Sequence, residues 1–409
     1  MKILFVNTSE SIGGAAIAAG RLLRALRRSG MEVHMLVSNR QTENPAIVSL
    51  SRMSWKKKWN FVAERAWIFI RQRLSKRNLW AIDPATHGRD ITKSRYFREA
   101  DVIHLHWVNQ GMLSMKCLQK ILESGKPVVW TMHDMWPFTG VCHHADDCEN
   151  WKTHCGHCRL LQKGKCERDL SYKTFEKKME IYGKGKFHFV ACSKWLENLA
   201  KESPLLKNHE LTQIPNAIDT KFYVPGDREE ARRALNLPLD KPLILFVAAK
   251  ATDEGKGFAY LADAVRKMSQ EVGVVIVGQE AEIAANLLKD NVFPFEYVSN
   301  RDKMRTLYQA ADLLAMPTLH DNLPNTIVEA VSCGLPCVGF EIGGLPEMIE
   351  HEKTGYLVKY RDTDDLKNGL EWTLEHKEKL SHIARERALE SYSELAVAAE
   401  YKKIYEKIV

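Results

Sequence analysis

The chain has 409 residues, more than a single hydrophobic core usually holds, so we expect two domains of about two hundred residues each. Because 45% of the residues are hydrophobic, each half can bury a core of its own. The formal net charge of +7 favours anionic partners only weakly, and no recognised nucleic-acid reader motif accompanies it. We therefore expect no nucleic-acid partner.

The first ten residues hold too short an apolar run for a secretory signal peptide, and no later run approaches the length of a membrane span. We therefore expect a cytoplasmic protein. Its nine cysteines would then stay reduced, so a cluster of them is better interpreted as metal ligands than as disulfides.

Apolar, strand-like segments alternate with helix-like sequence through both halves, which predicts parallel βαβ units. The predicted strands are 2–7, 33–37, 102–107, 127–133 and 187–192 in the first half, and 242–248, 274–277, 313–316 and 336–340 in the second. Two doubly wound α/β domains fit this alternation better than one. The turn-forming segment Ile214 to Asp219 marks the expected junction, and a ligand would lie in the cleft that the two domains face.

Ligands of such sheets bind beyond the carboxyl ends of the strands. The first strand is followed by Gly13 and Gly14, just before a helix-like segment, so backbone N–H groups there could approach a phosphate or a sugar. The pair lacks the three-glycine dinucleotide fingerprint. A glycine turn with a packing role is the alternative.

Histidines accompany the third and fourth predicted strands. His133 stands with Asp134 at the end of strand 127–133, while His104 and His106 alternate on the preceding strand and share a face. An imidazole at a strand end can hydrogen-bond to a sugar hydroxyl near neutral pH. The alternative for each is a structural histidine with satisfied hydrogen bonds. Because His133 lies at a strand exit, it is a stronger candidate for sugar binding than the other two.

Two lysines follow strand 242–248. Lys250 and Lys256 are six residues apart, with glycines on both sides of the second. Paired cations at a strand exit can hold a diphosphate and stabilise the charge that develops when it leaves. Solvated surface lysines are the alternative.

An acidic residue, seven spacers and a glutamate follow strand 313–316. The sequence predicts a polar turn and a short helix from about Pro324, so backbone N–H groups at its start form an anion site. Glu329 lies about one helical turn after Asn325 and can accept hydrogen bonds from a diol such as ribose, while Asp321 faces a second polyol. Such a site fits a sugar nucleotide. A turn aspartate and a solvated helix glutamate are the alternatives.

A cysteine cluster follows the His133 loop. It consists of Cys142, Cys148, Cys155 and Cys158, and His143, His144, His154, His157 or Cys166 could replace one thiol. Four thiols in one loop-rich segment fit a tetrahedral, structural Zn²⁺ that would pin the loop beside His133. Reduced cysteines without metal are the alternative.

Segment 52–77 is both cationic and aromatic. Trp55, Trp59 and Phe69 with interspersed Lys and Arg suit a helix in a lipid headgroup layer, which would bring the protein to a lipid-linked acceptor. The alternative is a helix whose aromatic residues pack on the domain while its lysines are solvated.

The order of these motifs resembles the retaining glycosyltransferases of family 4, which have the GT-B fold of two Rossmann-like domains. The resemblance spans nearly the whole chain. It rests on Gly13-Gly14, Thr131-Met132-His133, segment 214–219, Lys250 with Lys256, Asp321 to Glu329, Cys333 to Pro336, Gly343 to Glu347 and Gly355 to Val358. The sequence HDMWPFTG at 133–140, placed before the cysteines, is similar to a polysaccharide-biosynthesis branch of the family.

The resemblance implies a domain at 1–217 on the acceptor side, a nucleotide-sugar domain at 218–393 and a C-terminal helix at 394–409 that crosses back to the first domain. The implied catalytic residues are His133, Lys250, Lys256 and Asp321. The implied donor-binding residues are Gly13, Gly14, Asn216, Lys250, Lys256, Asn325, Thr326, Ile327 and Glu329. Family members usually carry Arg in place of Lys250 and Glu in place of Asp321; lysine keeps the charge but loses the bidentate fork, and aspartate shortens the reach by one methylene.

The implied function is transfer of a hexose, with retention, from a UDP- or GDP-sugar to a glycan or lipid-linked glycan in polysaccharide biosynthesis. The enzyme would need no catalytic metal and would contact the inner membrane surface through 52–77. The alternatives are a GT-B sugar-nucleotide hydrolase or epimerase, and a scaffold that binds the sugar nucleotide without turnover.

Overall fold

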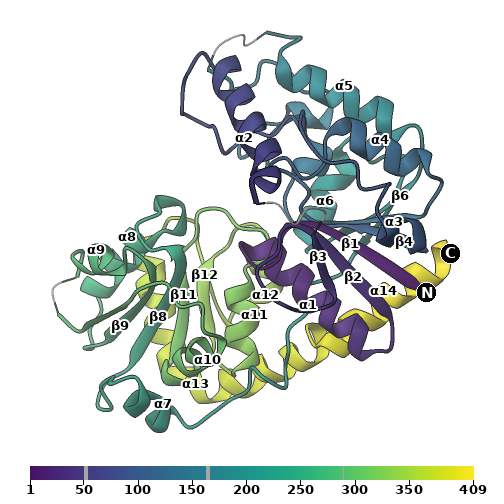
Figure 1. Cartoon of the computed structure of the whole chain (residues 1–409). Coiled ribbons are helices and arrows are strands. Elements are labelled where there is room, and N and C mark those ends of the chain that lie inside the picture. Colours follow the sequence, from purple (N-terminus) through teal and green to yellow (C-terminus); the bar gives the residue numbers. More distant parts are fainter. Residues whose placement is uncertain (50–53, 163–165, 289) are drawn as a thin grey trace. The chain divides into compact units, whose positions relative to one another are not determined.

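The computed structural model describes residues 1–49, 54–162, 166–288 and 290–409, and for residues 54–58 it describes the backbone alone. The chain divides into two compact units (Figure 1). The first unit comprises Met1–Pro215 together with Val397–Val409, and the second comprises Asn216–Ala396. The unit boundary thus lies two residues before the expected end of the first domain at 217.

The first unit is built on a seven-stranded sheet in the order β3-β2-β1-β4-β5-β6-β7, and all of its strand pairs are parallel. Its strands are β1 (Lys2–Ser9), β2 (Glu32–Asn39), β3 (Ile47–Ser49), β4 (Val102–Leu105), β5 (Val128–Met132), β6 (Phe187–Ala191) and β7 (Glu210–Gln213). The five predicted strands of this half are confirmed. The sequence did not predict the outermost strands β3 and β7, because both are short and partly polar.

Helices flank this sheet, and several begin at a Ser or Asp that accepts a backbone N–H. The helices are α1 (Gly14–Arg28), α2 (Ser54–Arg71), α3 (Arg95–Glu99), α4 (Met115–Glu123), η1 (Trp136–Phe138), η2 (Asn150–Lys152), α5 (Leu170–Tyr182) and α6 (Lys194–Glu202). Asp169, for example, accepts hydrogen bonds from Ser171 N and Tyr172 N at the start of α5. These caps set where each connection from strand to helix ends.

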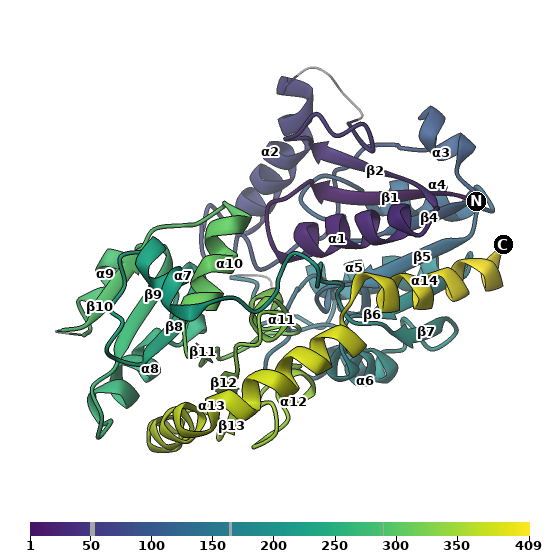
Figure 2. The same cartoon turned by 90° about the horizontal axis from the view of Figure 1, so that it is seen from below.

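The C-terminal helix α14 (Glu394–Ile408) runs beside the strands of the first sheet, in yellow in Figures 1 and 2. Its Tyr405 hydroxyl lies 2.7 Å from Nδ1 of His104 on β4, and its Tyr401 hydroxyl lies 2.8 Å from Oγ1 of Thr131 on β5. Both tyrosines are buried. The helix is therefore part of the core of the first unit, although it is distant from that core in sequence.

The second unit is built on a six-stranded parallel sheet in the order β10-β9-β8-β11-β12-β13. Its strands are β8 (Leu243–Lys250), β9 (Gly273–Gln279), β10 (Val292–Phe295), β11 (Leu313–Met316), β12 (Cys337–Phe340) and β13 (Gly355–Val358). Its helices are α7 (Arg228–Ala234), η3 (Glu254–Lys256), α8 (Phe258–Arg266), α9 (Ala281–Ala285), α10 (Arg301–Ala310), α11 (Asn325–Ser332), α12 (Leu345–Met348) and α13 (Thr363–Ser391). The four predicted strands of this half are confirmed.

The helix α2 is anchored to the first unit by polar residues. Arg65 donates hydrogen bonds to Leu79 O (2.7 Å) and to Asp83 Oδ2 (3.1 Å), and it pairs with Glu64 at 3.6 Å. Glu64 Oε1 accepts a hydrogen bond from Thr86 N at 2.9 Å. Together these contacts tie the inward face of α2 to the segment that follows it.

Burial raises the pKa of Glu64 to about 8, the charge of Asp83 adds to the rise, and Arg65 opposes it. The folded state then holds a proton on Glu64 that the unfolded state releases above its ordinary pKa of 4.5. A raised carboxyl pKa makes the folded state lose stability as the pH rises from about 4.5 to about 8. The Glu64→Gln variant keeps the shape of the side chain and removes the proton equilibrium.

We predict that the free energy of unfolding of Glu64→Gln falls less than that of the wild type between about pH 5 and about pH 8. Urea unfolding followed by circular dichroism at several pH values measures this. Glu197→Gln is the control, because Glu197 is also buried but its pKa is lowered. An equal loss of stability in the wild type and Glu64→Gln would contradict the assignment.

Candidate functional site

The loops that follow β8 and β11 pack against each other at the carboxyl edge of the second sheet. Leu319 N donates to Gly255 O at 2.8 Å, and Thr318 Oγ1 donates to the same oxygen at 3.1 Å. Gly257 has φ +72°, and a Cβ atom there would lie 1.8 Å from Pro317 O, so this approach requires glycine. The packing brings the loop with Lys256 against the loop with Asp321.

Both predicted phosphate-binding lysines are ion-paired. Lys256 Nζ lies 2.9 Å from Asp321 Oδ2, and Lys250 Nζ lies 2.9 Å from Oε1 of Glu280, which follows β9. The Lys256 and Asp321 side chains are 31% and 21% exposed, and the Lys250 side chain is 50% exposed. Pairs this accessible contribute little stability, so an incoming polyanion can exchange with either carboxylate at small cost. Sequence reasoning missed Glu280, because it lies 30 residues from Lys250.

The helix α11 begins at Asn325, close to the predicted start at Pro324. Asn325 and Thr326 are half-buried in its first turn, and Asn216 Nδ2 lies 3.5 Å from Asn325 Oδ1. Ile327 N donates to Pro324 O at 3.1 Å, so a phosphate at this helix start would compete with that bond for the Ile327 N–H. The two loops and the start of α11 thus belong to one edge of the second sheet.

Glu329 is buried, with 8% of its surface exposed, so its interpretation as a solvated helix residue is wrong. Its Oε2 accepts a hydrogen bond from the hydroxyl of Tyr308, on α10, at 2.7 Å. Burial, with a further contribution from the charge of Glu329, raises the pKa of Tyr308 well above its usual value, so this hydroxyl stays a donor. Sequence reasoning missed Tyr308, because no motif links α10 to α11.

In the first unit, Gly13 and His133 lie at the carboxyl ends of β1 and β5. Gly13 has φ +89°, a Cβ atom there would have no neighbour within 4 Å, and α1 begins at Gly14. His133 Nε2 lies 3.3 Å from Nδ1 of His106. His104 contacts Tyr405 through one ring nitrogen and Thr131 through the other, so it is a structural histidine.

The charge of His133 is set by its surroundings. Burial lowers its pKa to about 4, although the neighbouring Asp134 carboxylate acts in the opposite direction. Asp134 itself accepts hydrogen bonds from Trp107 Nε1 and Trp136 N, both at 2.9 Å, and contacts His143 Nδ1 at 2.7 Å. At neutral pH the His133 ring is therefore uncharged, and it can act as a hydrogen-bond partner rather than as a cation.

The four cysteines of the predicted zinc site all belong to the first unit. Burial raises the pKa of Cys142 and of Cys155 to about 12, and Cys155 Sγ accepts a hydrogen bond from Gly140 N at 3.2 Å. Among the described residues, no three His, Cys, Asp or Glu side chains are arranged to hold a metal ion. This arrangement gives zinc binding at Cys142, Cys148, Cys155 and Cys158 no support, and it stays a prediction.

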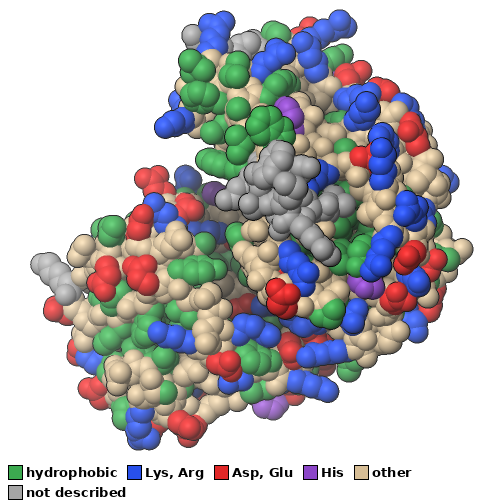
Figure 3. Space-filling view, in the orientation of Figure 1, with side chains coloured by type: hydrophobic (Ala, Val, Ile, Leu, Met, Phe, Trp, Pro, Cys, Tyr) green, Lys and Arg blue, Asp and Glu red, His purple; other side chains and the backbone are tan. Residues whose placement is uncertain are grey.

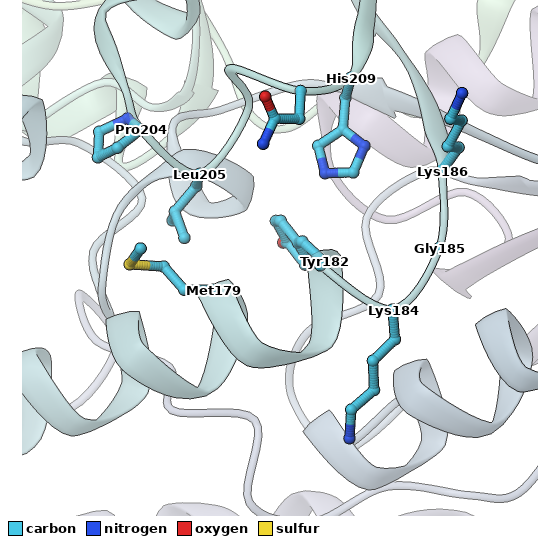
Figure 4. Close-up of a pocket in the computed structure, with 10 residues that line it drawn as sticks. Met179, Tyr182, Lys184, Gly185, Lys186, Pro204, Leu205 and His209 are labelled. Atoms are coloured by element: carbon cyan, nitrogen blue, oxygen red, sulfur yellow. The ribbon is translucent and has the colours of Figure 1, made fainter.

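A pocket of about 410 Å³ lies elsewhere in the first unit, between the end of α5 and the start of β6 (Figure 4). Met179 and Leu205 line one side, and Tyr182 and His209 line another. The pocket adjoins the amino end of β6, whereas the predicted site residues follow the carboxyl ends of strands. None of those residues lines it, so it is not the candidate site.

A family model described as Glycosyltransferase Family 4 matches residues 12–222, about half of the chain, and a model described as Glycosyl transferases group 1 matches residues 227–390. The chain belongs to glycosyltransferase family 4. Its two parallel-sheet units have the GT-B fold that the sequence predicts. The two family models meet near the boundary between the units.

Individual relatives of this family 4 member are distant. N-acetyl-alpha-D-glucosaminyl L-malate synthase of Bacillus anthracis is 22% identical over 48% of this chain and 54% of its own length. The putative colanic acid biosynthesis glycosyl transferase WcaC of Escherichia coli is 23% identical over 61% of this chain and 62% of its own length. These matches span less than two thirds of either relative. Anabaena Alr3699/HepE, solved in complex with UDP-glucose, is similar in fold over 100% of both chains, with a TM-score of 0.66 and 15% identity.

We predict that Tyr308→Phe lowers the free energy of unfolding by about 1–3 kcal/mol, because it removes the hydrogen bond that Tyr308 donates to the buried Glu329 carboxylate. Urea unfolding followed by tryptophan fluorescence measures the loss. Tyr260→Phe is the matched control in the same unit, because Tyr260 is partly buried against the apolar core of that unit. Equal effects of the two variants would contradict an anchoring role for Tyr308.

Proposed function

We propose that this chain is a retaining glycosyltransferase that moves a hexose from a UDP- or GDP-sugar to a hydroxyl group of a glycan or lipid-linked glycan in cell-surface polysaccharide biosynthesis. The observation that carries the proposal is the ion pair of Lys256 with Asp321, in the loop that leads into α11, the helix of Glu329. Family membership supports it further. The enzyme would work at the cytoplasmic face of the membrane.

The donor would bind through its diphosphate and its ribose. Lys250 and Lys256 would exchange their carboxylate partners for phosphate oxygens, near the N–H groups of Thr326 and Ile327 at the start of α11. Glu329, held in place by Tyr308, would accept hydrogen bonds from the ribose diol. The diol would then bind a carboxylate that is already oriented, which lowers the entropic cost of binding.

The transfer step forms one C–O bond and breaks another. The acceptor oxygen would attack the anomeric carbon on the face from which the diphosphate leaves, and the acceptor proton would pass to a departing phosphate oxygen. Lys250 and Lys256 would stabilise the negative charge that develops on the diphosphate, so this route requires no protein nucleophile and no catalytic metal. Asp321, released from Lys256, and the neutral His133 would each bind a hydroxyl of the transferred sugar.

The names of similar proteins support a choice of donor and acceptor to test first. The complex of Alr3699/HepE with UDP-glucose favours a UDP-sugar as the first donor to test. The colanic acid function in the name of WcaC favours a polysaccharide acceptor, whereas the B. anthracis relative is named for a malate product.

Lysine at 250 keeps the positive charge and lacks the fork of arginine, so Lys250→Arg should retain donor binding.

We predict that one of a set of UDP-, GDP- and ADP-sugars raises the melting temperature of the wild type and fails to raise that of Lys256→Ala or Glu329→Ala. A ligand at about 100 times its Kd stabilises the folded state by about 2.7 kcal/mol, which a thermal-shift assay detects. Lys267→Ala is the matched control, because Lys267 is also an ion-paired lysine of the second unit. If no sugar nucleotide shifts the wild type, the donor site is wrongly assigned.

Turnover with the donor so identified separates the remaining alternatives. Transfer to a glycan acceptor with unchanged anomeric configuration, measured by NMR of the product, is the expected result. Hydrolysis or epimerisation of the donor at the same rate with and without acceptor would favour the sugar-nucleotide hydrolase or epimerase. Donor binding without turnover towards any acceptor would favour the scaffold.

A further inference from the structure

The helix α2 exposes three large apolar residues on one face, while its opposite face buries Ile68 together with polar residues. Trp59, Val62 and Ile70 are 65%, 53% and 66% exposed, and their spacing places them on one face of the helix. Glu64 is 0% exposed, and Arg65 and, just beyond the end of the helix, Gln72 are also buried. A surface helix of a globular protein normally turns its large apolar residues towards the core, so three exposed ones on a single face are unusual.

Two residues beyond the helix extend this apolar surface. Leu74 and Trp80 are 66% and 59% exposed. The Trp80 ring stacks on Phe61 of α2 at a centroid distance of 5.9 Å, and the Arg65 guanidinium lies 5.6 Å from the Trp80 ring centroid. Trp80 is thus held beside the stripe. We name the set Trp59, Val62, Ile70, Leu74 and Trp80 the α2 patch, and Figure 3 shows hydrophobic side chains gathered over this helix.

Among the described side chains of residues 54–80, which include the α2 patch, every exposed charged side chain is positive. Arg71, Arg73, Lys76 and Arg77 are exposed. Glu64 is the single acidic residue of the sequence from 54 to 80, and it is fully buried. The lysines at 56–58 add to the positive charge of the sequence, although their side chains, like residues 52 and 53 and the side chain of Trp55, fall outside what the structure describes.

We propose that the α2 patch docks on the surface of a bilayer containing anionic phospholipids, with its apolar side chains among the acyl chains nearest the headgroups. Transfer of exposed apolar surface out of water drives such docking, and tryptophan is well suited to the interface. The arginines and Lys76 then meet anionic headgroups, each contributing attraction that salt weakens. The helix lies on the membrane: among the described residues, no helix is long and apolar enough to cross it.

The charge pattern favours a lipid surface over a second copy of this chain. Two copies joined through the α2 patch would bring together two sets of four exposed cations with no exposed acid between them in this segment, and like charges in contact oppose association. The alternative in which the aromatic residues pack on the domain holds for Phe61, Trp67 and Phe69, which are partly buried, and fails for Trp59 and Trp80.

Membrane docking deepens the proposed function, because a lipid-linked acceptor would be presented at that surface. Its test needs no sugar transfer, so the two proposals can fail separately. The full chain is sedimented with vesicles of phosphatidylcholine alone and of phosphatidylcholine with phosphatidylglycerol. We expect the wild type to bind the anionic vesicles at least about tenfold more tightly than the neutral ones, and added salt to reduce this difference.

Two double variants separate the apolar and the electrostatic contributions. Ile70→Ser with Leu74→Ser should weaken binding to anionic vesicles by about tenfold or more. Arg73→Gln with Arg77→Gln should weaken binding to anionic vesicles by about tenfold and leave binding to neutral ones unchanged. The matched control is Ile283→Ser with Leu287→Ser, two residues of the second unit that are 58% and 48% exposed. Circular dichroism verifies that each variant is folded.

Three results would overturn the proposal. The wild type could fail to bind anionic vesicles at low salt, the Ile70/Leu74 variant could bind as tightly as the wild type, or the Ile283/Leu287 control could lose binding equally. Light scattering tests the competing occupant: a wild-type dimer that Ile70→Ser with Leu74→Ser converts to a monomer would assign the α2 patch to self-association. Quenching of tryptophan fluorescence by brominated phosphatidylcholine, reduced in Trp59→Phe, would place Trp59 at the acyl chains.

Discussion

The parallel pairing of strands is the constraint on which the candidate site depends. In a parallel sheet every strand ends at the same edge, so loops far apart in sequence meet there. In the second unit this brings the loop after β8 against the loop after β11, with Gly257 allowing their close contact. Lys256 and Asp321 are 65 residues apart and form an ion pair only because both loops leave the sheet at this edge.

The ion pairs of the two lysines explain how a site for a polyanion can exist in a folded protein without strong repulsion between its positive charges. Lys250 and Lys256 each have a carboxylate partner, so the positive charge that would attract a diphosphate is balanced when no diphosphate is bound. The pairs are partly exposed and therefore weak. Glu329 differs, because it is buried and held by Tyr308. The second unit thus combines exchangeable charges with one fixed carboxylate.

Much of this arrangement could be predicted from the sequence. Buried parallel strands such as β1 and β8 are nearly continuous apolar runs, so their positions were evident, as was the short helix α11. The edge strands β3 and β7 lack that signal. Partners such as Tyr308 and Glu280 could not be predicted either, because they reach the site through tertiary packing that no local pattern records.

The orientation of α2 on the first unit shows this limit of prediction from sequence most clearly. Its sequence contains both an apolar stripe and a polar stripe, and helical periodicity alone cannot say which one meets the core. The orientation of the helix depends on hydrogen-bond partners elsewhere in the chain. Arg65 donates to Asp83 and to the carbonyl of Leu79, and Glu64 accepts from the N–H of Thr86. Those contacts hold the face with Glu64 and Arg65 inward, so the face with Trp59, Val62 and Ile70 is left at the surface, where a hydrophobic partner can cover it.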